Sequence, residues 1–381
     1  MQPYHPALRV KQGECTAIAK IARDIQRQIQ PRFIIPPPKE SDPAKGRPLT
    51  PDEIAYETGR RIGKNWPFEV AFLDAQYVAS FLGDSGLRTL FRTAQYQNGK
   101  LVAVATVDDL FNPTFAAFLR ASAPRVAIFV PYEKVDTKRI LDGMKSLGCA
   151  PEDCVIFVDF NKAPFELEGI EIAVAAIFDE IAAAAQWHRI VFQGSSFPKT
   201  NPAKAKGTFT VTRHEWDVFQ AAIKECSVSP NLIGYGDYGP DSSEIKFSKK
   251  KGGAVPYRHI RYTIDGSNLV VRGSDTGAQA SAMKDVCQTI LTSGKFLGRD
   301  FSYADEAIYQ IGNGRWSAGT PSMWREWNMA HHMTYIVRQL GAQEGKTFEF
   351  GRFSKDAEQS SLWPETEDEP SGTGPEVAVG G

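Results

Sequence analysis

Eight short apolar runs recur along the chain, and each ends in a polar or acidic residue before a stretch that can be helical. Nearly continuous Val, Ile, Phe and Ala within the runs is typical of strands buried on both faces of a parallel sheet. Eight strand–helix units predict an α/β fold, the (β/α)8 TIM-type barrel. The predicted strands are Ala7–Val10, Phe33–Pro36, Glu69–Leu73, Leu101–Val107, Arg125–Val130, Cys154–Asp159, Arg189–Gln193 and Leu232–Tyr235.

Helical stretches follow most of these runs, and the pattern changes after the eighth. Alternating residues at 258–264 and 268–272 flank Asp265-Gly266, which predicts a β-hairpin over 258–272. We expect one barrel domain over residues 1–345 that includes this hairpin, and a disordered acidic, Gly/Pro-rich tail over 356–381. The predicted helices are 15–29, one beginning at Pro51, 113–120, 137–147, 169–185, 214–226, 278–292 and 323–340.

Composition changes this picture little. The 381 residues carry a formal net charge of -1, which argues against a globally basic nucleic-acid binder and leaves room for a local basic surface. We find no secretory signal and no apolar run approaching ~18 residues, so we expect no membrane span. Five scattered cysteines without a CxxC motif predict reduced thiols and a cytoplasmic protein.

Polar side chains cluster where the predicted strands end. A parallel barrel brings strand carboxyl ends to one rim, where several carboxylates and a lysine could bind a divalent cation or share acid/base work. Because Asp and Asn also commonly cap helices after strands, each position has a structural alternative. The strand-end residues are Lys11, Glu14, Asp74, Asp108, Asp159, Asn161, Ser195, Asp237 and Tyr238.

Two short motifs predict anion contacts. Lys11-Gln12-Gly13-Glu14 places a glycine turn before a helix, where free backbone amides can hold a phosphate and Lys11 adds charge. The motif lacks the spacing of a Walker A loop. Arg272 closes the hairpin beside Gly273 and Ser274, where it could bind an anion or belong to a surface turn.

The segment Trp324–His332 contains two tryptophans, one arginine and two of the six histidines. On a helix, one face carries Trp324, Asn328, His331 and His332, with Arg325 beside it, and this surface is suited to stacking on a ring and contacting phosphate. The alternative is that the tryptophan and one histidine pack under the barrel. The segment lacks the HExxH motif, and no GxSxG motif is present, so neither a zincin nor an α/β-hydrolase is supported.

Several of these residues resemble a known family. The strand leading into Lys11-Gln12-Gly13-Glu14, the Asp237-Tyr238-Gly239 segment and the helix with Trp324-Arg325 and His331-His332 are similar to the beta protein family of phages and bacteria, over most of residues 4–340. The resemblance implies a phage- or defence-linked context rather than a particular reaction. The candidate site residues that it implies are Lys11, Gly13, Glu14, Asp237, Tyr238, Trp324, Arg325, His331 and His332.

Two functions remain open. In the first, the rim is an enzyme site for a phosphate-bearing ligand, a nucleotide or a nucleic-acid end. Lys11, Arg272 and Arg325 would hold the anion, and Glu14, Asp159 or Asp237 would act as base or metal ligand. In the second, the barrel is a non-catalytic module that recognises a ligand or protein partner in an anti-phage system, through the hairpin and the Trp324–His332 helix.

Overall fold

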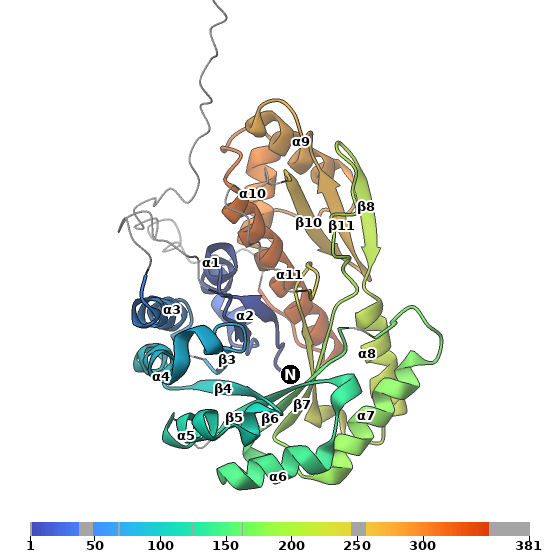
Figure 1. Cartoon of the computed structure of the whole chain (residues 1–381). Coiled ribbons are helices and arrows are strands. Elements are labelled where there is room, and N and C mark those ends of the chain that lie inside the picture. The colour runs from blue at the N-terminus through green and yellow to red at the C-terminus, as the bar shows by residue number, and fades with distance from the viewer. Residues whose placement is uncertain are drawn as a thin grey trace, which may run out of the picture.

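The computed structural model describes residues 2–37, 49–67, 69–122, 125–161, 163–244 and 257–349. Eight parallel strands form one sheet in the order β1-β2-β3-β4-β5-β6-β7-β9, with helices between them (Figure 1). This confirms the predicted (β/α)8 barrel. The strands are β1 (Ala7–Arg9), β2 (Arg32–Ile34), β3 (Ala71–Asp74), β4 (Leu101–Thr106), β5 (Val126–Pro131), β6 (Val155–Asp159), β7 (Arg189–Gly194) and β9 (Ile233–Asp237).

The barrel is nearly closed. Its two edge strands meet where the backbone N–H of His5 donates to the carbonyl of Tyr235 at 2.9 Å. Gly236 permits this approach, because a Cβ at that position would lie 2.5 Å from the carbonyl oxygen of His5. A glycine in β9 therefore joins the last strand to the first.

Within the described residues, eleven α-helices lie between or after these strands. The predicted 15–29 helix is in fact two, because Ile21 and Ala22 are extended. The side chain of Gln26 donates to the carbonyls of Ile18 and Ala19 at the end of the first. The helices are α1 (Gln12–Lys20), α2 (Arg23–Gln26), α3 (Pro51–Asn65), α4 (Ala79–Gln97), α5 (Pro113–Ser122), α6 (Thr137–Leu147), α7 (Ile170–Ala184), α8 (His214–Glu225), α9 (Gln279–Thr292), α10 (Tyr303–Gly312) and α11 (Pro321–Gln343).

The inside of the barrel has its own apolar cluster, built from alternate residues of β3 to β7. The residues between them belong to the larger cluster that packs under the helices. Because side chains alternate along a strand, this division tells which strand residues face the interior. The interior cluster comprises Phe72, Val102, Val104, Ala127, Phe129, Val155, Phe157 and Val191.

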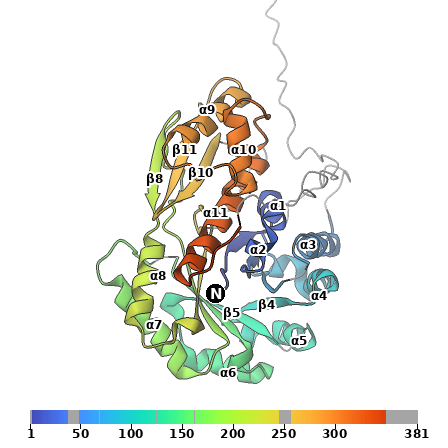
Figure 2. The ribbon, with the colours of Figure 1, turned by 180° about the vertical axis from the view of Figure 1, so that it is seen from behind.

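A second sheet forms a cap beside the carboxyl ends of the strands. It has the order β10-β11-β8, where β8 (Thr208–Thr212) lies between β7 and α8, and β10 (His259–Ile264) and β11 (Ser267–Arg272) follow β9. We define the cap as β8, β10, β11, α9 and α10, which lie together away from the barrel strands in opposite views (Figures 1 and 2). The predicted hairpin is confirmed, with His259 opposite Arg272.

The hydrophobic pattern leaves α4, α10 and β8 unpredicted. Gly83 interrupts α4 with a φ of 60°, so its helical periodicity is broken. Strand β8 reads Thr-Phe-Thr-Val-Thr, its residues other than Val211 are exposed, and its ladder partner β11 is distant in sequence. Local sequence therefore carries little signal for pairing that depends on tertiary contacts.

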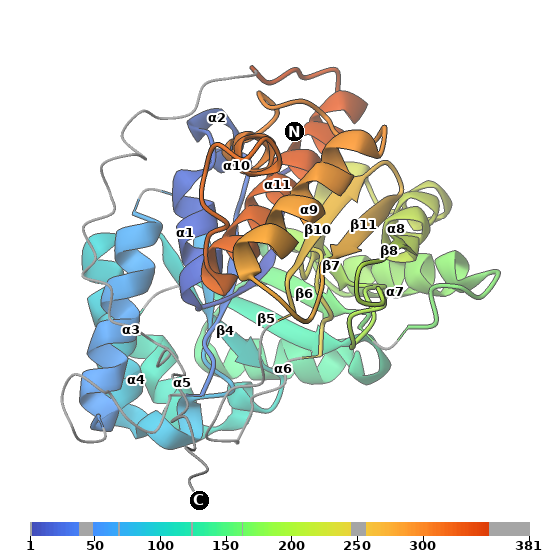
Figure 3. The same cartoon turned by 90° about the horizontal axis from the view of Figure 1, so that it is seen from above.

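Helix α11 connects the two parts of the molecule. It packs against α1 of the barrel and against β10 and α10 of the cap. Viewed from above, α9, α10 and α11 lie in front of the barrel strands (Figure 3). One apolar cluster runs through both parts, from barrel residues such as Leu73 to cap residues such as Met283. The predicted tail at 356–381 lies outside the described residues.

Candidate ligand-binding site at the barrel mouth

We use "mouth" for the carboxyl end of the barrel strands together with the segment 238–244 that follows β9. The first polar network of the mouth centres on Arg32, which is buried in the barrel. Its Nη1 donates to Asp74 Oδ2 at 2.5 Å, and its Nη2 donates to Tyr238 Oη at 3.2 Å. Tyr238 in turn donates to Asp159 Oδ1 at 2.9 Å. Arg32 thus links two strand-end carboxylates through one ion pair and one phenol.

The alternation of side chains between the two faces of each strand explains why these carboxylates meet. Asp74 and Asp159 lie two residues beyond the interior residues Phe72 and Phe157, so they face the inside of the barrel. The guanidinium of Arg32 lies 4.3 Å from the ring centre of Phe129, which helps offset its removal from water.

Asp159 is the carboxylate of this network that has a raised pKa. Burial raises its pKa to about 6, although Arg32 and the hydrogen bond from Tyr238 oppose the shift. A carboxyl group with a pKa near neutrality can both accept and release a proton at physiological pH. Asp159 is therefore a candidate acid/base group at the mouth.

The second network centres on Asp241, in the segment after β9. Arg9 Nη1 donates to Asp241 Oδ2 at 2.6 Å, Arg261 Nη1 donates to Oδ1 at 2.6 Å, and Arg325 Nη1 donates to Oδ2 at 3.1 Å. These guanidinium groups hold the pKa of Asp241 far below its usual range, despite the opposing effect of burial. Three arginines from β1, β10 and α11 thus share one carboxylate.

Glu14 and Lys11 border this second network. Glu14 Oε1 accepts from Arg325 Nη1 at 2.7 Å, whereas its Oε2 is buried without a hydrogen-bond partner. Burial raises the pKa of Glu14, against the charge of Arg325. Burial, with the nearby charge of Arg325, lowers the pKa of the Lys11 ammonium, which has no ion-pair partner within the described residues.

The segment after β9 ties the two networks together. Tyr238 belongs to the first network and Asp241 to the second, and the carbonyl of Ser242 accepts from Arg9 Nη2 at 2.7 Å. Ser243 donates to the side chain of Asn161. Residues 238–244 thus take part in both networks.

A cavity of about 300 Å³ opens between this segment, the start of β10 and the first turns of α11. Its volume lies at the lower end of the range for small-molecule sites, roughly 300–1,000 Å³. Both Arg261 and Arg325 contribute to its wall, as does Asp241. Other lining residues include Tyr257, His259, Trp324 and Asn328.

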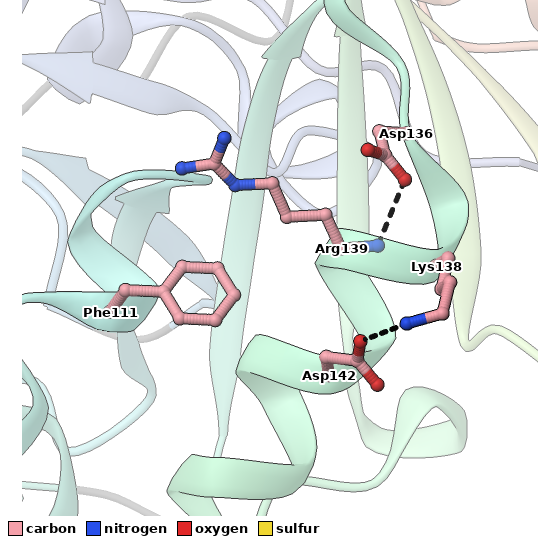
Figure 4. Close-up of a pocket in the computed structure, with 5 residues that line it drawn as sticks. All are labelled: Phe111, Asp136, Lys138, Arg139 and Asp142. Atoms are coloured by element: carbon pink, nitrogen blue, oxygen red, sulfur yellow. Dashed lines mark hydrogen bonds and ion pairs between the residues drawn. The ribbon is translucent and has the colours of Figure 1, made fainter.

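A second cavity, of about 400 Å³, lies between Phe111 and the start of α6 (Figure 4). Its charged groups form local, exposed ion pairs, such as Lys138 Nζ to Asp142 Oδ2 at 2.7 Å. The Arg139 guanidinium lies 5.4 Å from the ring centre of Phe111 and pairs with Asp108. Although larger, this cavity contains no buried charge, so we place the candidate site at the mouth.

The structure brings most of the predicted rim together. The predicted residues that lie at the mouth or in the helices beside it are Lys11, Glu14, Asp74, Asp159, Asn161, Tyr238, Trp324 and Arg325. Trp324 lines the cavity but is almost completely buried, and its indole N–H donates to the carbonyl of Ala318 at 2.8 Å. It is thus a wall of the cavity rather than an exposed stacking surface. Ser195, a further strand-end residue, donates to the carbonyl of Asp241 at 2.9 Å.

Asp237 does not face the mouth, contrary to the prediction. In β9, Gly234 and Gly236 pair in register with Val191 and Gln193 of β7, and Val191 belongs to the interior cluster. The next residue, Asp237, therefore points its side chain out of the barrel. Its carboxylate accepts from Tyr4 Oη at 2.5 Å and lies 3.0 Å from His332 Nε2. Burial opposes ionisation, but His332 and Tyr4 together hold the pKa of Asp237 below its usual value.

The two histidines are also remote from solvent. His332 Nδ1 lies 2.7 Å from Thr263 Oγ1, and burial lowers its pKa despite the charge of Asp237. His331 Nδ1 lies 3.0 Å from Asp305 Oδ2, and its ring stacks on Tyr262. Each histidine is about 1% exposed. The predicted ligand-binding face is instead an internal contact that joins α11 to β9, β10 and α10.

Gly13 and Arg272 have structural partners in place of a ligand. A Cβ at Gly13 would lie 2.6 Å from the carbonyl oxygen of Ser322, so this glycine allows α1 to approach α11 closely. Arg272 forms an ion pair with Asp275 at 2.7 Å, donates to the carbonyl of Ala203, and stacks on Tyr257. Neither residue reaches the Asp241 network.

Sequence reasoning missed four functional candidates: Arg9, Arg32, Asp241 and Arg261. A signal was present for the first two, because Arg9 lies inside one apolar run and Arg32 directly precedes another. Charged side chains in a strand that is buried on both faces require a partner, and they are informative for that reason. Asp241 and Arg261 had no comparable signal, since only the fold brings them together.

Within the described residues, no group of three or more His, Cys, Asp or Glu side chains is placed to hold a metal ion, and no helix is long and apolar enough to cross a membrane. Comparison with curated proteins finds no match for the chain. A family model described as Beta protein matches residues 4–338, which is most of the chain. The protein therefore belongs to the Beta protein family.

Proposed function

We propose that the barrel mouth binds a phosphate-bearing ligand, a nucleotide or a nucleic-acid end. The observation that carries this proposal is the convergence of Arg9, Arg261 and Arg325 on the single carboxylate of Asp241. With Lys11 and Glu14 included, four cationic side chains face two carboxylates. Guanidinium groups with surplus positive charge are the usual partners of phosphate oxygens.

The second part of the proposal is turnover. Asp159 supplies a carboxylate with a pKa of about 6 at the same mouth, held by Tyr238. In a hydrolytic reaction it would accept a proton from the attacking water. A divalent cation would bind together with the phosphate rather than in a protein cage of its own, as Mg²⁺ commonly does.

The test of binding uses Lys11, because its ammonium has no ion-pair partner to disturb. Titration of the full chain with inorganic phosphate and with ribose 5-phosphate should show binding that weakens as salt increases. Lys11→Gln should reduce affinity roughly tenfold, the loss of one charged contact. Lys138→Gln, at the exposed second cavity, is the matched control and should bind like the unmodified chain. Equal affinity in Lys11→Gln and Lys138→Gln would refute the site.

The test of turnover is release of inorganic phosphate from nucleotides in the presence of Mg²⁺. Asp159→Asn should abolish release and leave ligand affinity within about twofold, because the residue acts on the proton rather than on binding. Release that continues in Asp159→Asn would remove this residue from the mechanism.

A non-catalytic module in an anti-phage system is the second candidate function. The exposed edge strand β8, with Phe209 about half exposed, favours it, because an unpaired strand edge can add a strand from a partner. Under this alternative, Asp159→Asn would leave any effect of the chain on phage plating efficiency unchanged. Loss of the effect in that variant would favour the enzyme.

A further inference from the structure

The cavity beside the Asp241 network has features that phosphate binding alone does not need. An aromatic ring, an amide and a neutral imidazole share its wall with the two arginines that would hold a phosphate. We infer that this cavity receives the heteroaromatic base of a mononucleotide, stacked against Tyr257 and hydrogen-bonded by Asn328 and His259. The inference rests on the proposed function for the position of the phosphate.

Tyr257 is the stacking surface. Its side chain is 50% exposed although it lines the cavity. The guanidinium of Arg272 lies 3.8 Å from the ring centre and covers one face, while Asp275 and the carbonyl of Ala203 hold Arg272 in place. A ring held on one side and open on the other can stack on a base at low entropic cost. Arg272 is therefore a positioning residue for this ring.

Asn328 provides an oriented hydrogen-bond donor. Its Oδ1 accepts from the backbone N–H of Arg261 at 3.0 Å, which fixes the orientation of the amide. The Nδ2 group has no hydrogen-bond partner among the described residues, and the side chain is 92% buried in the cavity wall. An oriented amide donor in the cavity wall is free to bond an acceptor of a ligand.

His259 provides an acceptor. Its Nδ1 lies 2.8 Å from the carbonyl oxygen of Tyr257, so Nδ1 bears the hydrogen and Nε2 is left as the acceptor. Burial, with the charge of Arg261, lowers the pKa of His259 to about 4, so the ring is neutral at physiological pH.

A donor and an acceptor on one wall match the edge of a nucleobase, which presents an acceptor nitrogen or oxygen next to an N–H group. A sugar phosphate offers no aromatic ring to stack on Tyr257. Arg261 and Arg325 line the same cavity as the ring and the amide, so one cavity offers groups for both a base and a phosphate. Four probes separate the two parts: AMP, adenosine, ribose 5-phosphate and inorganic phosphate.

We expect AMP to bind the full chain at least tenfold more tightly than ribose 5-phosphate in calorimetric titrations, since stacking of one base contributes that much or more. Tyr257→Ala should reduce AMP affinity to the level of ribose 5-phosphate, and Tyr257→Phe should retain it. Neither variant should change ribose 5-phosphate binding. The exposed ring is not part of the core, so both variants should fold.

The outcomes separate this inference from the proposed function. Equal affinities for AMP and ribose 5-phosphate would overturn the base subsite and leave phosphate binding intact. Binding of adenosine without any binding of ribose 5-phosphate or inorganic phosphate would support the base subsite and overturn the phosphate site. Equal loss of AMP affinity in Tyr257→Ala and Tyr257→Phe would refute stacking. GMP used in place of AMP would measure how far the donor–acceptor pair selects the base.

Discussion

Replacing Arg32 with methionine should destabilise the protein more than any exposed charge change. Arg32 and Asp74 are 1% and 2% exposed and form a 2.5 Å ion pair inside the barrel. The variant leaves Asp74 without its cation and also removes the charge near Asp159. Breaking a buried pair by removing one partner costs about 3–5 kcal/mol, because the remaining charge stays out of water.

The assay is urea unfolding followed by tryptophan fluorescence, together with scanning calorimetry. The expected loss corresponds to a fall in Tm of at most roughly 6–20 °C, because each kcal/mol shifts Tm by about 2–4 °C in domains of about 150–250 residues and by less in a longer chain. Arg32→Met combined with Asp74→Asn should recover part of the lost stability, since the second substitution removes the carboxylate that has no cation.

The matched control is Arg139→Met, whose ion pair with Asp108 joins side chains that are 53% and 87% exposed. An exposed pair contributes less than about 1 kcal/mol, so this variant should unfold almost like the parent. Equal stability of Arg32→Met and Arg139→Met, or no recovery in the double variant, would refute the reasoning.

Three further predictions concern the mouth and its supports. Gly13→Ala should lower the free energy of unfolding in urea by about 1–3 kcal/mol, because its Cβ would lie 2.6 Å from the Ser322 carbonyl oxygen. An unchanged midpoint would contradict the packing role of Gly13. The pKa of Asp159 is raised to about 6, so its protonation stabilises the folded state at low pH, and this contribution is lost as the pH rises from about 4 to about 6. Asp159→Asn should lack this pH dependence, on the order of 3 kcal/mol, when Tm is measured across that range. Asp241→Asn should lower Tm in the absence of ligand, because three arginines lose their carboxylate partner. The same change should enlarge the increase in Tm caused by inorganic phosphate. A smaller increase than in the parent would count against anion binding by these arginines.

Local sequence predicted the barrel well for a physical reason. Strands buried on both faces need continuous apolar residues, and this need leaves a pattern that does not depend on distant parts of the chain. The predicted 137–147 helix coincides with α6, where Asp136 caps the first turn and Gly148 adopts the left-handed conformation at the end. Elements with such local start and stop signals could be placed from sequence.

The candidate site was predictable only in part. The strand-end positions of Asp74 and Asp159 followed from the barrel, and both face its interior. Asp237 looked equivalent in sequence. Its position in β9 is shifted by one residue relative to the inward-facing positions, so its side chain points outward to His332. The Trp324–His332 helix was recognised as unusual, but its polar groups serve internal contacts. A buried polar network and a binding surface use the same residue types, and sequence does not separate them.

The sequence by itself determined the eight strand–helix units and the end of the barrel at which polar residues gather, because periodicity and strand direction are local properties. Only the tertiary structure decided which of those residues meet. Arg9, Asp241, Arg261 and Arg325 are separated by up to 316 positions along the chain, and they converge because the cap and α11 fold back over the strand ends. Long-range packing sets that convergence, and no short segment of sequence encodes it.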